Sequence, residues 1–292
     1  MGLWNNIWGW RSLNIHSGDL VLEVASGSHP FARADVLLDK FLLDSTERMD
    51  SIVIDRPFVC GDAECLPFID GAFDYIYSSH TLEHMIHPER TIREFMRVGR
   101  KGYIVTPNKR AEALFGWDYH THILWIEDDT LVLEQKCSDN WGYFADGYFH
   151  KAWSNDRDFR RFCDCHTADF EVRYEWEGAI DYRIICHGES ALPKQNPAEL
   201  GCFTNFGSVP LSSGLRSQVR STISRLVRRV HGCSSFDLTT LLACPICRVK
   251  IRKEVDTFLC PECDRCYPEV NGIPVMLPEK LAGPTLQEVD AR

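Results

Sequence analysis

Short apolar runs alternate with helical patterns through roughly the first 190 residues of the chain, which is typical of a parallel sheet covered by helices. The segment PERTIREFMRVG at 88–99 predicts a helix, because Pro88 suits a first turn and the apolar residues recur on one face. We therefore expect an α/β fold with a Rossmann-like, mostly parallel sheet and helices on both faces. The runs predict strands at 19–25, 35–39, 52–59, 73–79 and 102–106. FEVRYEWEG and DYRIICHG predict two further strands that together close one edge of this sheet.

Carboxylates follow the first three predicted strands. Glu23 and Gly27 lie in VLEVASGSHPF, Asp39 ends the second strand, and Asp62 lies in GDAECLPF after the third. Because ligands bind outside the carboxyl ends of parallel strands, these acids are expected to share one site, where a carboxylate can accept ribose hydroxyls. The chain has no glycine-rich pyrophosphate loop here, so an adenosine with a positive charge, such as S-adenosylmethionine, fits better than NAD or ATP. The alternative is that each Asp only caps a turn.

These segments, with FDYIYSSHTLEH and GYIVTPN, resemble the class I S-adenosylmethionine-dependent methyltransferases, particularly the ubiquinone-methylase-like group. The resemblance implies a methyltransferase domain over residues 1–188. Ala25 stands where the family usually has its first glycine, and His29 where a third is common. The resemblance also implies that the cofactor is bound by Glu23, Ala25, Gly27, Asp39, Asp62, Ala63, Ser79 and His80.

Several ionisable side chains follow the fourth and fifth predicted strands. Methyl transfer from a sulfonium mainly requires alignment, and a general base is needed only when the acceptor carries a proton of high pKa. Histidine suits that role because it titrates near neutral pH. Alternatively, Glu83 and His84 belong to the start of a helix. In that case His120 and His122 pack beside Trp117 and Trp125. The candidate bases are His80, Glu83, His84, His120 and His122.

The C-terminal part contains two C-x2-C pairs. Four thiolates at such spacing predict a structural zinc site with no open coordination position. The expected ligands are Cys244, Cys247, Cys260 and Cys263. Cys266 is expected to pack, or to exchange with Cys263. The crowded CDCH segment at 163–166 is expected to be structural.

The segments ACPIC, YP and GIPVML resemble the small zinc-ribbon activator subunit of tRNA, ribosomal-RNA and release-factor methyltransferases. This implies a ribbon at 239–280 that docks on the catalytic domain and stabilises or activates it. Residues 189–238 are expected to be a linker, and 281–292 a tail.

The linker contains GLRSQVRSTISRLVRRV, an amphipathic, basic pattern without acids. We expect a helix that packs on its own protein; an RNA-phosphate patch and an interfacial membrane helix are the alternatives. Its apolar positions are Leu215, Val219, Ile223, Leu226, Val227 and Val230, and its basic ones are Arg216, Arg220, Arg225, Arg228 and Arg229.

Composition limits the function classes. The formal net charge of -10 argues against a continuous nucleic-acid groove. No stretch approaches the ~20 apolar residues that span a bilayer, and the first residues do not resemble a signal peptide. The 13 cysteines are therefore expected to be reduced or metal-bound in a cytoplasmic protein. We expect a methyl acceptor that is a small molecule, sugar or lipid-linked intermediate, bound by residues 109–180; the alternatives are RNA or protein, or a catalytically silent scaffold that recruits a partner.

Overall fold

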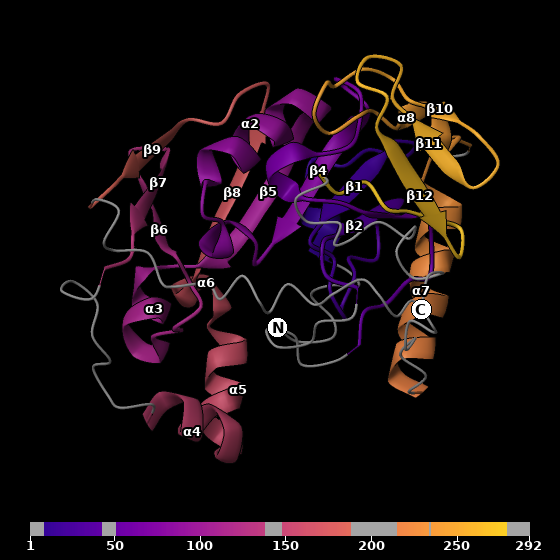
Figure 1. Ribbon diagram of the computed structural model, residues 1–292. Coiled ribbons are helices and arrows are strands. Elements are labelled where there is room, and N and C mark those ends of the chain that lie inside the picture. Colours follow the sequence, from indigo (N-terminus) through magenta and orange to yellow (C-terminus); the bar gives the residue numbers. More distant parts are fainter. Residues whose placement is uncertain (1–8, 43–50, 138–147, 188–214, 234, 279–292) are drawn as a thin grey trace, which may run out of the picture.

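A six-stranded sheet forms the centre of the computed structural model, which describes residues 9–42, 51–137, 148–187, 215–233 and 235–278 (Figure 1). The strand order is β3-β2-β1-β4-β5-β8, with the first five strands parallel and β8 antiparallel to β5. This confirms the predicted mostly parallel α/β sheet. The strands are β1 (Val21–Val24), β2 (Val36–Asp39), β3 (Phe58–Cys60), β4 (Phe73–Ser79), β5 (Gly99–Pro107) and β8 (Glu171–Glu177).

One predicted edge strand lies elsewhere. β8 closes the main sheet as expected, but β9 (Tyr182–Ile185) pairs with β7 (Thr130–Gln135), which pairs with β6 (His122–Glu127) in a separate three-stranded sheet. Gly178 has a left-handed backbone (φ 75°) directly after β8, so the chain turns away from the main sheet there. The prediction that both strands close one edge was therefore wrong for the second.

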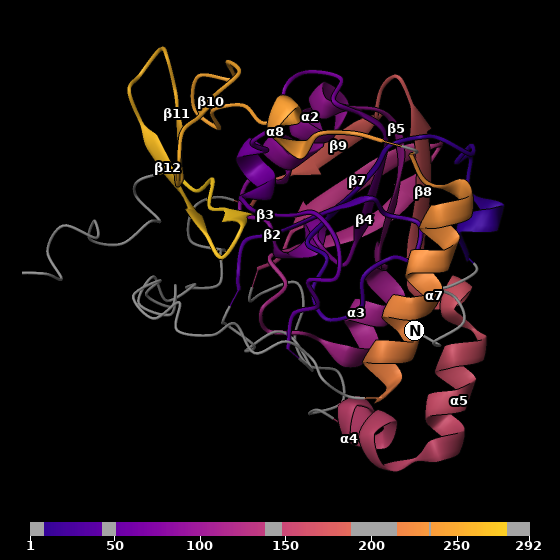
Figure 2. The same ribbon diagram turned by 90° about the vertical axis from the view of Figure 1, so that its right-hand side faces the viewer.

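Helices cover both faces of the main sheet. On one face, Leu22 and Val24 share a core with Ile92 and Phe95 of α2 (Pro88–Val98). The alternate residue Val21 points to the other face and belongs to a second core. That core includes Val227 of α7 (Leu215–His231), which runs alongside the sheet (Figure 2).

The packing of the basic helix is therefore confirmed for part of its apolar pattern. Ile223 and Val227 pack against the sheet, whereas Val219, Leu226 and Val230 are exposed. The backbone N–H of Gly18 donates to the carbonyl of His231, so the helix is also held at its C-terminal end.

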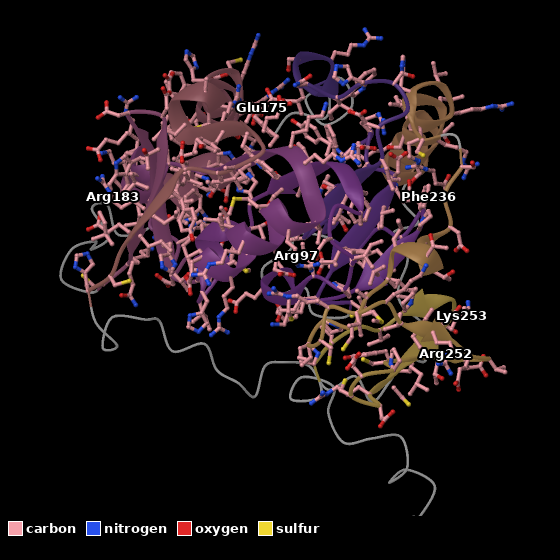
Figure 3. All side chains as sticks on the ribbon, turned by 90° about the horizontal axis from the view of Figure 1, so that it is seen from above. Arg97, Glu175, Arg183, Phe236, Arg252 and Lys253 are labelled. Atoms are coloured by element: carbon pink, nitrogen blue, oxygen red, sulfur yellow. The ribbon has the colours of Figure 1, made fainter. Side chains whose placement is uncertain are left out.

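A second, smaller antiparallel sheet lies at one end of the molecule. Its core residues Leu242, Phe258 and Tyr267 are continuous with the main core. Seen from above, Arg252 of this sheet lies far from Arg183 of β9 (Figure 3). Its strands are β10 (Arg252–Lys253), β11 (Thr257–Leu259), β12 (Cys266–Val270) and β13 (Ile273–Pro274), and the short helix α8 (Leu238–Leu241) precedes them.

The remaining elements connect the strands. Four helices lie beside the three-stranded sheet and below the main sheet in Figure 1: α3 (Lys109–Phe115), α4 (Tyr148–Asn155), α5 (Arg157–Cys165) and α6 (Thr167–Phe170). Three 3-10 turns are η1 (Gly9–Ser12), η2 (Ala63–Cys65) and η3 (Leu82–His84). None of the helices in the described ranges is long and apolar enough to cross a bilayer.

Candidate functional site

Asp39 joins the end of β2 to the turn that follows β1. Its Oδ2 accepts a hydrogen bond of 2.9 Å from the backbone N–H of Gly27, and Oδ1 accepts one of 2.9 Å from that of Phe41. Gly27 has a φ of 55°, a conformation that glycine adopts without steric cost. The predicted cofactor loop and the predicted ribose ligand are thus in contact.

Asp62 serves as the cap of η2. Its Oδ1 accepts a hydrogen bond from the backbone N–H of Glu64 at 2.9 Å, and Oδ2 pairs with Nζ of Lys40 at 2.8 Å. The hydrogen bond with Glu64 is the contact expected if Asp62 caps a turn, as the alternative interpretation states. Since Lys40 follows Asp39 directly, the ion pair also places Asp62 and the buried Ala63 next to the end of β2. A role in binding adenine stays a prediction.

Glu23 lies inside β1 with its side chain buried. Oε2 accepts a hydrogen bond of 2.8 Å from the backbone N–H of Phe31, beyond the glycine turn. Burial raises the pKa of Glu23 to about 8, because desolvation outweighs this hydrogen bond and the attraction of Arg56. A cationic ligand beside Glu23 would favour its ionised form.

The raised pKa of Glu23 gives a stability prediction. In the unfolded chain the carboxyl has its ordinary pKa near 4.5, so between about pH 4.5 and 8 the unfolded state loses a proton that the folded state keeps. The Glu23 contribution to the free energy of unfolding is complete below this window and falls, by on the order of a few kcal/mol, as pH rises through it.

Glu23→Gln mimics the protonated acid and should remove this dependence, so the variant should gain stability over wild type as pH rises. Urea unfolding at several pH values between 5 and 8.5 measures the difference. Glu254→Gln, at an exposed position, is the matched control and should parallel wild type. Parallel pH profiles for Glu23→Gln and wild type would contradict the prediction.

Two non-glycine residues have left-handed backbones at neighbouring strand ends. Ala25 (φ 59°) follows β1 and His80 (φ 55°) follows β4, and these strands pair directly. Such conformations cost about 1–2 kcal/mol in an L-residue, and strained residues cluster at functional sites. A glycine at position 25 would adopt this conformation without that cost.

Buried hydroxyl groups accompany this edge of the sheet. Within the described ranges, the Oγ atoms of Ser26 and Ser78 and the Oγ1 of Thr106 have no hydrogen-bond partner. They lie at or just beyond the carboxyl ends of β1, β4 and β5. Buried polar groups are normally paired, so these hydroxyls fit a site that a polar cofactor completes. The half-buried Ser79 ends β4, and the exposed His80 follows it directly.

The predicted bases separate into two groups. Glu83 and His84 in η3 approach His120, and ligand atoms of the three lie within 4.8 Å of one another. His80 lies beside them, with Nδ1 at 3.3 Å from Oε1 of Glu83. Burial alone would raise the pKa of Glu83, but the contact with His80 and the charges of the neighbouring histidines lower it to about 2. Glu83 is therefore an anion.

His122 does not join this group. Its Nδ1 lies 3.0 Å from Oγ1 of Thr121, and burial lowers its pKa to about 4. It is therefore neutral and inside the core, as the packing alternative states. The other histidine of that alternative also packs, since the rings of His120 and Trp117 lie 4.8 Å apart.

Sequence reasoning missed two residues behind His120. Oε2 of Glu112 lies 2.8 Å from Nδ1 of His120, and Nζ of Lys136 pairs with the same carboxylate. All of these side chains are mostly shielded from solvent. Glu112 lies on α3 and Lys136 follows β7, so no local pattern in the sequence links them.

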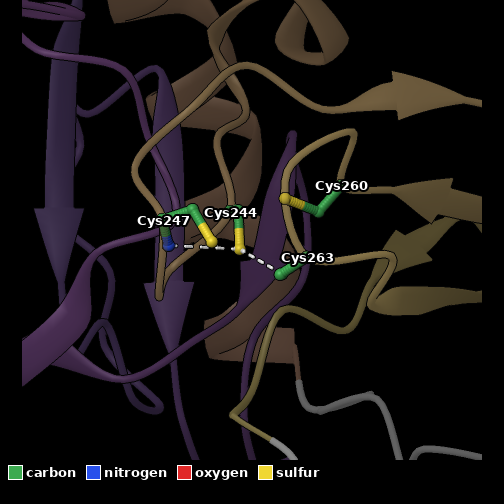
Figure 4. A group of neighbouring side chains, drawn as sticks. All are labelled: Cys244, Cys247, Cys260 and Cys263. Atoms are coloured by element: carbon green, nitrogen blue, oxygen red, sulfur yellow. Dashed lines mark hydrogen bonds between the residues drawn. The ribbon is translucent and has the colours of Figure 1, made fainter.

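The four cysteines of the C-x2-C pairs meet in the C-terminal sheet (Figure 4). Their Sγ atoms lie within 4.8 Å of one another, and Cys244 Sγ is 3.9 Å from Cys263 Sγ. This arrangement fits a tetrahedral metal, with thiolates as the donor set that zinc prefers. Cys266 is exposed and outside the group, so its predicted packing was wrong. CDCH belongs to no such group among the described residues.

The two C-x2-C turns, which we call knuckles, have matching backbone geometry. The N–H of Arg248 donates to the carbonyl of Cys244, and that of Asp264 donates to Cys260, at 2.8 and 3.0 Å. Both Arg248 and Asp264 have left-handed backbones, with φ of 61° and 55°. The chain thus makes the same turn twice and aims the sulfur atoms at one point.

Residues on either side of the small sheet form backbone hydrogen bonds with both ends of the loop that contains Asp62. Before the loop, the N–H of Met276 donates to the carbonyl of Cys60 at 2.7 Å. After it, the N–H of Ala243 donates to the carbonyl of Pro67 at 2.9 Å, and Ile69 donates to Leu241. Phe68 and Cys60 also form β-bridges to this region.

Comparisons with known proteins match the N-terminal part. Residues 30–106 match a family model described as a methyltransferase domain. Over 104 residues, the chain is 34% identical to demethylmenaquinone methyltransferase from Renibacterium salmoninarum, covering 32% of this chain and 44% of that protein. The equivalent enzyme from Paenarthrobacter aurescens is 32% identical over 104 residues, covering 32% and 41%. The chain thus spans less than half the length of these relatives.

Two solved structures also show similarity. An S-adenosylmethionine-dependent methyltransferase from Mesorhizobium loti is 16% identical, covering 46% of this chain and 67% of that one, with a TM-score of 0.30. A complex between the Haloferax volcanii Trm112 methyltransferase activator and a methyltransferase contains a chain that is 19% identical, covering 37% and 53%, with a TM-score of 0.28.

Proposed function

We propose that this chain, which contains an S-adenosylmethionine-dependent methyltransferase domain, transfers the methyl group to a small-molecule, sugar or lipid-linked acceptor. The observation that carries the proposal is the hydrogen bond between Asp39 and Gly27. It brings an acid at one strand end and the glycine turn after the neighbouring strand to one edge, where Asp62 also lies.

The predicted cofactor ligands would divide the molecule between them, with Ser79 and His80 under the methionine moiety. Asp39 would hold the ribose, since each carboxylate oxygen can accept a second hydrogen bond beside the backbone one. Asp62 and Ala63 would meet the adenine, and Glu23 and Gly27 would belong to the cofactor loop, with Glu23 at the methionine end. Bound S-adenosylmethionine supplies an electrophilic methyl group on a sulfonium. The chain's task is then to align the acceptor with that methyl and keep water out.

Two observations favour a small acceptor. The matched relatives are named for demethylmenaquinone and for ajmaline. The ajmaline N-methyltransferase from Rauvolfia serpentina is 47% identical over 45 residues, covering 15% of this chain and 16% of that protein. The net charge of -10 disfavours a long phosphate-binding groove. The acceptor would approach from the side of His80 and His84, beyond β4.

The C-terminal sheet would act as a zinc ribbon that stabilises the catalytic domain in the same chain. Support comes from the four converging cysteines and from the backbone hydrogen bonds on both sides of the Asp62 loop. Zinc bound by the cysteines would fix the knuckles, and the knuckles would fix the loop. We place the ribbon at 239–280 and the catalytic domain at 1–188, with α7 packed on the sheet as the connection between them.

Transfer of a radiolabelled methyl group from S-adenosylmethionine to fractions of a cell extract tests this proposal. The wild-type chain should label a lipid or small-molecule fraction, and Asp39→Ala should not. Label that disappears after nuclease or protease treatment would instead support the RNA or protein alternative. Cofactor binding without any transfer would support the silent scaffold.

A further inference from the structure

Three side chains with metal-binding chemistry converge beyond the carboxyl end of β4. Glu83 and His84 belong to η3, and His120 precedes β6. One ligand atom from each lies within 4.8 Å of the others. The group shares no residue with the four cysteines. Its two imidazoles and one carboxylate also form a different donor set, one that suits several first-row metal ions.

The Glu83 carboxylate is the strongest sign of a missing ligand. Its side chain is 1% exposed, and neither oxygen has a hydrogen-bond partner among the described residues. Nδ1 of His80 lies 3.3 Å from Oε1 at ion-pair distance, but that ring is 43% exposed and faces solvent. A buried carboxylate without hydrogen bonds is costly. A cation between Glu83 and the two imidazoles would satisfy it.

His120 is oriented as a metal ligand would be. Its Nδ1 lies 2.8 Å from Oε2 of Glu112, so Nε2 is the ring nitrogen left to carry a ligand. Metal-bound histidines almost always donate their other N–H to a carboxylate or carbonyl in this way. Lys136 holds Glu112 through an ion pair and also donates to the carbonyl of Trp117 at 2.6 Å.

The backbone also fixes the position of Glu83 relative to His120. The N–H of Thr121, next to His120, donates to the carbonyl of Glu83 at 2.7 Å. The hydroxyl of Thr121 donates to the same carbonyl at 3.0 Å. His84 is held by its neighbours, with its ring stacked on Tyr119 at 5.6 Å and edge-on to His120 at 4.8 Å. The three ligands are therefore preorganised by contacts that need no metal.

We propose that Glu83, His84 and His120 form a second metal site, which binds a divalent first-row transition-metal ion separately from the cysteines. Two histidines and one carboxylate occupy three coordination positions and leave others open for a small ligand. An oxygen or nitrogen of the methyl acceptor would fill an open position; this role rests on the proposed function, whereas metal binding itself does not.

Cobalt(II) titration of the full-length, metal-stripped chain tests the site without any methyl transfer. Equilibrium dialysis with elemental analysis gives the stoichiometry, and the thiolate-to-cobalt charge-transfer band reports the cysteine site alone. Wild type should bind two cobalt ions per chain. Glu83→Gln should bind one and keep the full charge-transfer band, and its thermal unfolding should show that the whole chain is folded. Cys260→Ser should bind one and lose the band.

Two more variants distinguish a metal site from a structural cluster. Glu112→Gln keeps the size of the side chain that supports His120 and should weaken the second cobalt site by roughly 10–100-fold without changing the first. His166→Ala, at an exposed histidine, should leave both sites intact. One cobalt ion per wild-type chain, or two in Glu83→Gln, would overturn the proposal. Two sites in a chain without methyl transfer would leave the metal site standing and contradict the proposed function.

Discussion

Replacing Asp39 with alanine should weaken the binding of S-adenosylmethionine by roughly 100-fold or more. Each hydrogen bond between a carboxylate and a ribose hydroxyl contributes about 1.5–3 kcal/mol, and the variant loses two. It also loses the acceptor for the N–H of Gly27, so the loop that must approach the cofactor is no longer tied to β2. Isothermal titration calorimetry on the wild type and the variant measures the change.

Two further variants make the Asp39 result specific. Asp39→Asn keeps one acceptor oxygen and should bind with intermediate affinity. Asp164→Ala removes an exposed carboxylate from α5 and should bind like wild type. Thermal unfolding of each variant separates lost affinity from lost folding. Wild-type affinity in a folded Asp39→Ala chain would remove Asp39 from the cofactor site.

Replacing Cys260 with serine should remove the zinc from the cysteine site and unfold the ribbon. Structural zinc contributes about 10–16 kcal/mol in zinc-finger peptides, so its loss removes a large part of the free energy that holds the two C-x2-C turns together. The Sγ of Cys260 is in the four-thiolate group and its side chain is fully buried. Elemental analysis and the loss of backbone amide protection within 239–278 measure the outcome.

The same substitution should reach the catalytic domain. The ribbon holds the carbonyl groups of Cys60 and Pro67 on either side of Asp62, so its unfolding frees that loop. We expect roughly tenfold weaker binding of S-adenosylmethionine, equal to about one lost hydrogen bond. Cys266→Ser is the matched control, since Cys266 is exposed and lies three residues after the last ligand. Undiminished zinc content in Cys260→Ser would contradict the assignment of the ligands.

The sequence predicted best what depends on local pattern and short spacing. The strand at 73–79 has the bounds that its apolar run predicts, and the C-x2-C pairs meet because each pair makes one compact turn. The contact of Asp39 with Gly27 follows from the order of parallel strands. These features need only the periodicity of the chain and the rule that strand ends share an edge.

Features that depend on tertiary packing were not predicted. The support of His120 by Glu112 and Lys136 joins a helix to the end of a later strand, which no spacing reveals. β9 pairs with β7 in the three-stranded sheet after the left-handed turn at Gly178, and its apolar pattern alone does not show which sheet it joins. Cys266 points outward because strand alternation turns its neighbour Tyr267 into the core.

A crystal structure of the full chain with S-adenosylhomocysteine tests the central claim most directly. Our account predicts the ribose hydroxyls within hydrogen-bond distance of Asp39, the adenine beside Asp62 and Ala63, and the sulfur near the turn that contains Ala25 and Gly27. A nucleoside bound elsewhere on the molecule, or electron density for the intact ligand that leaves Asp39 without a contact, would contradict it.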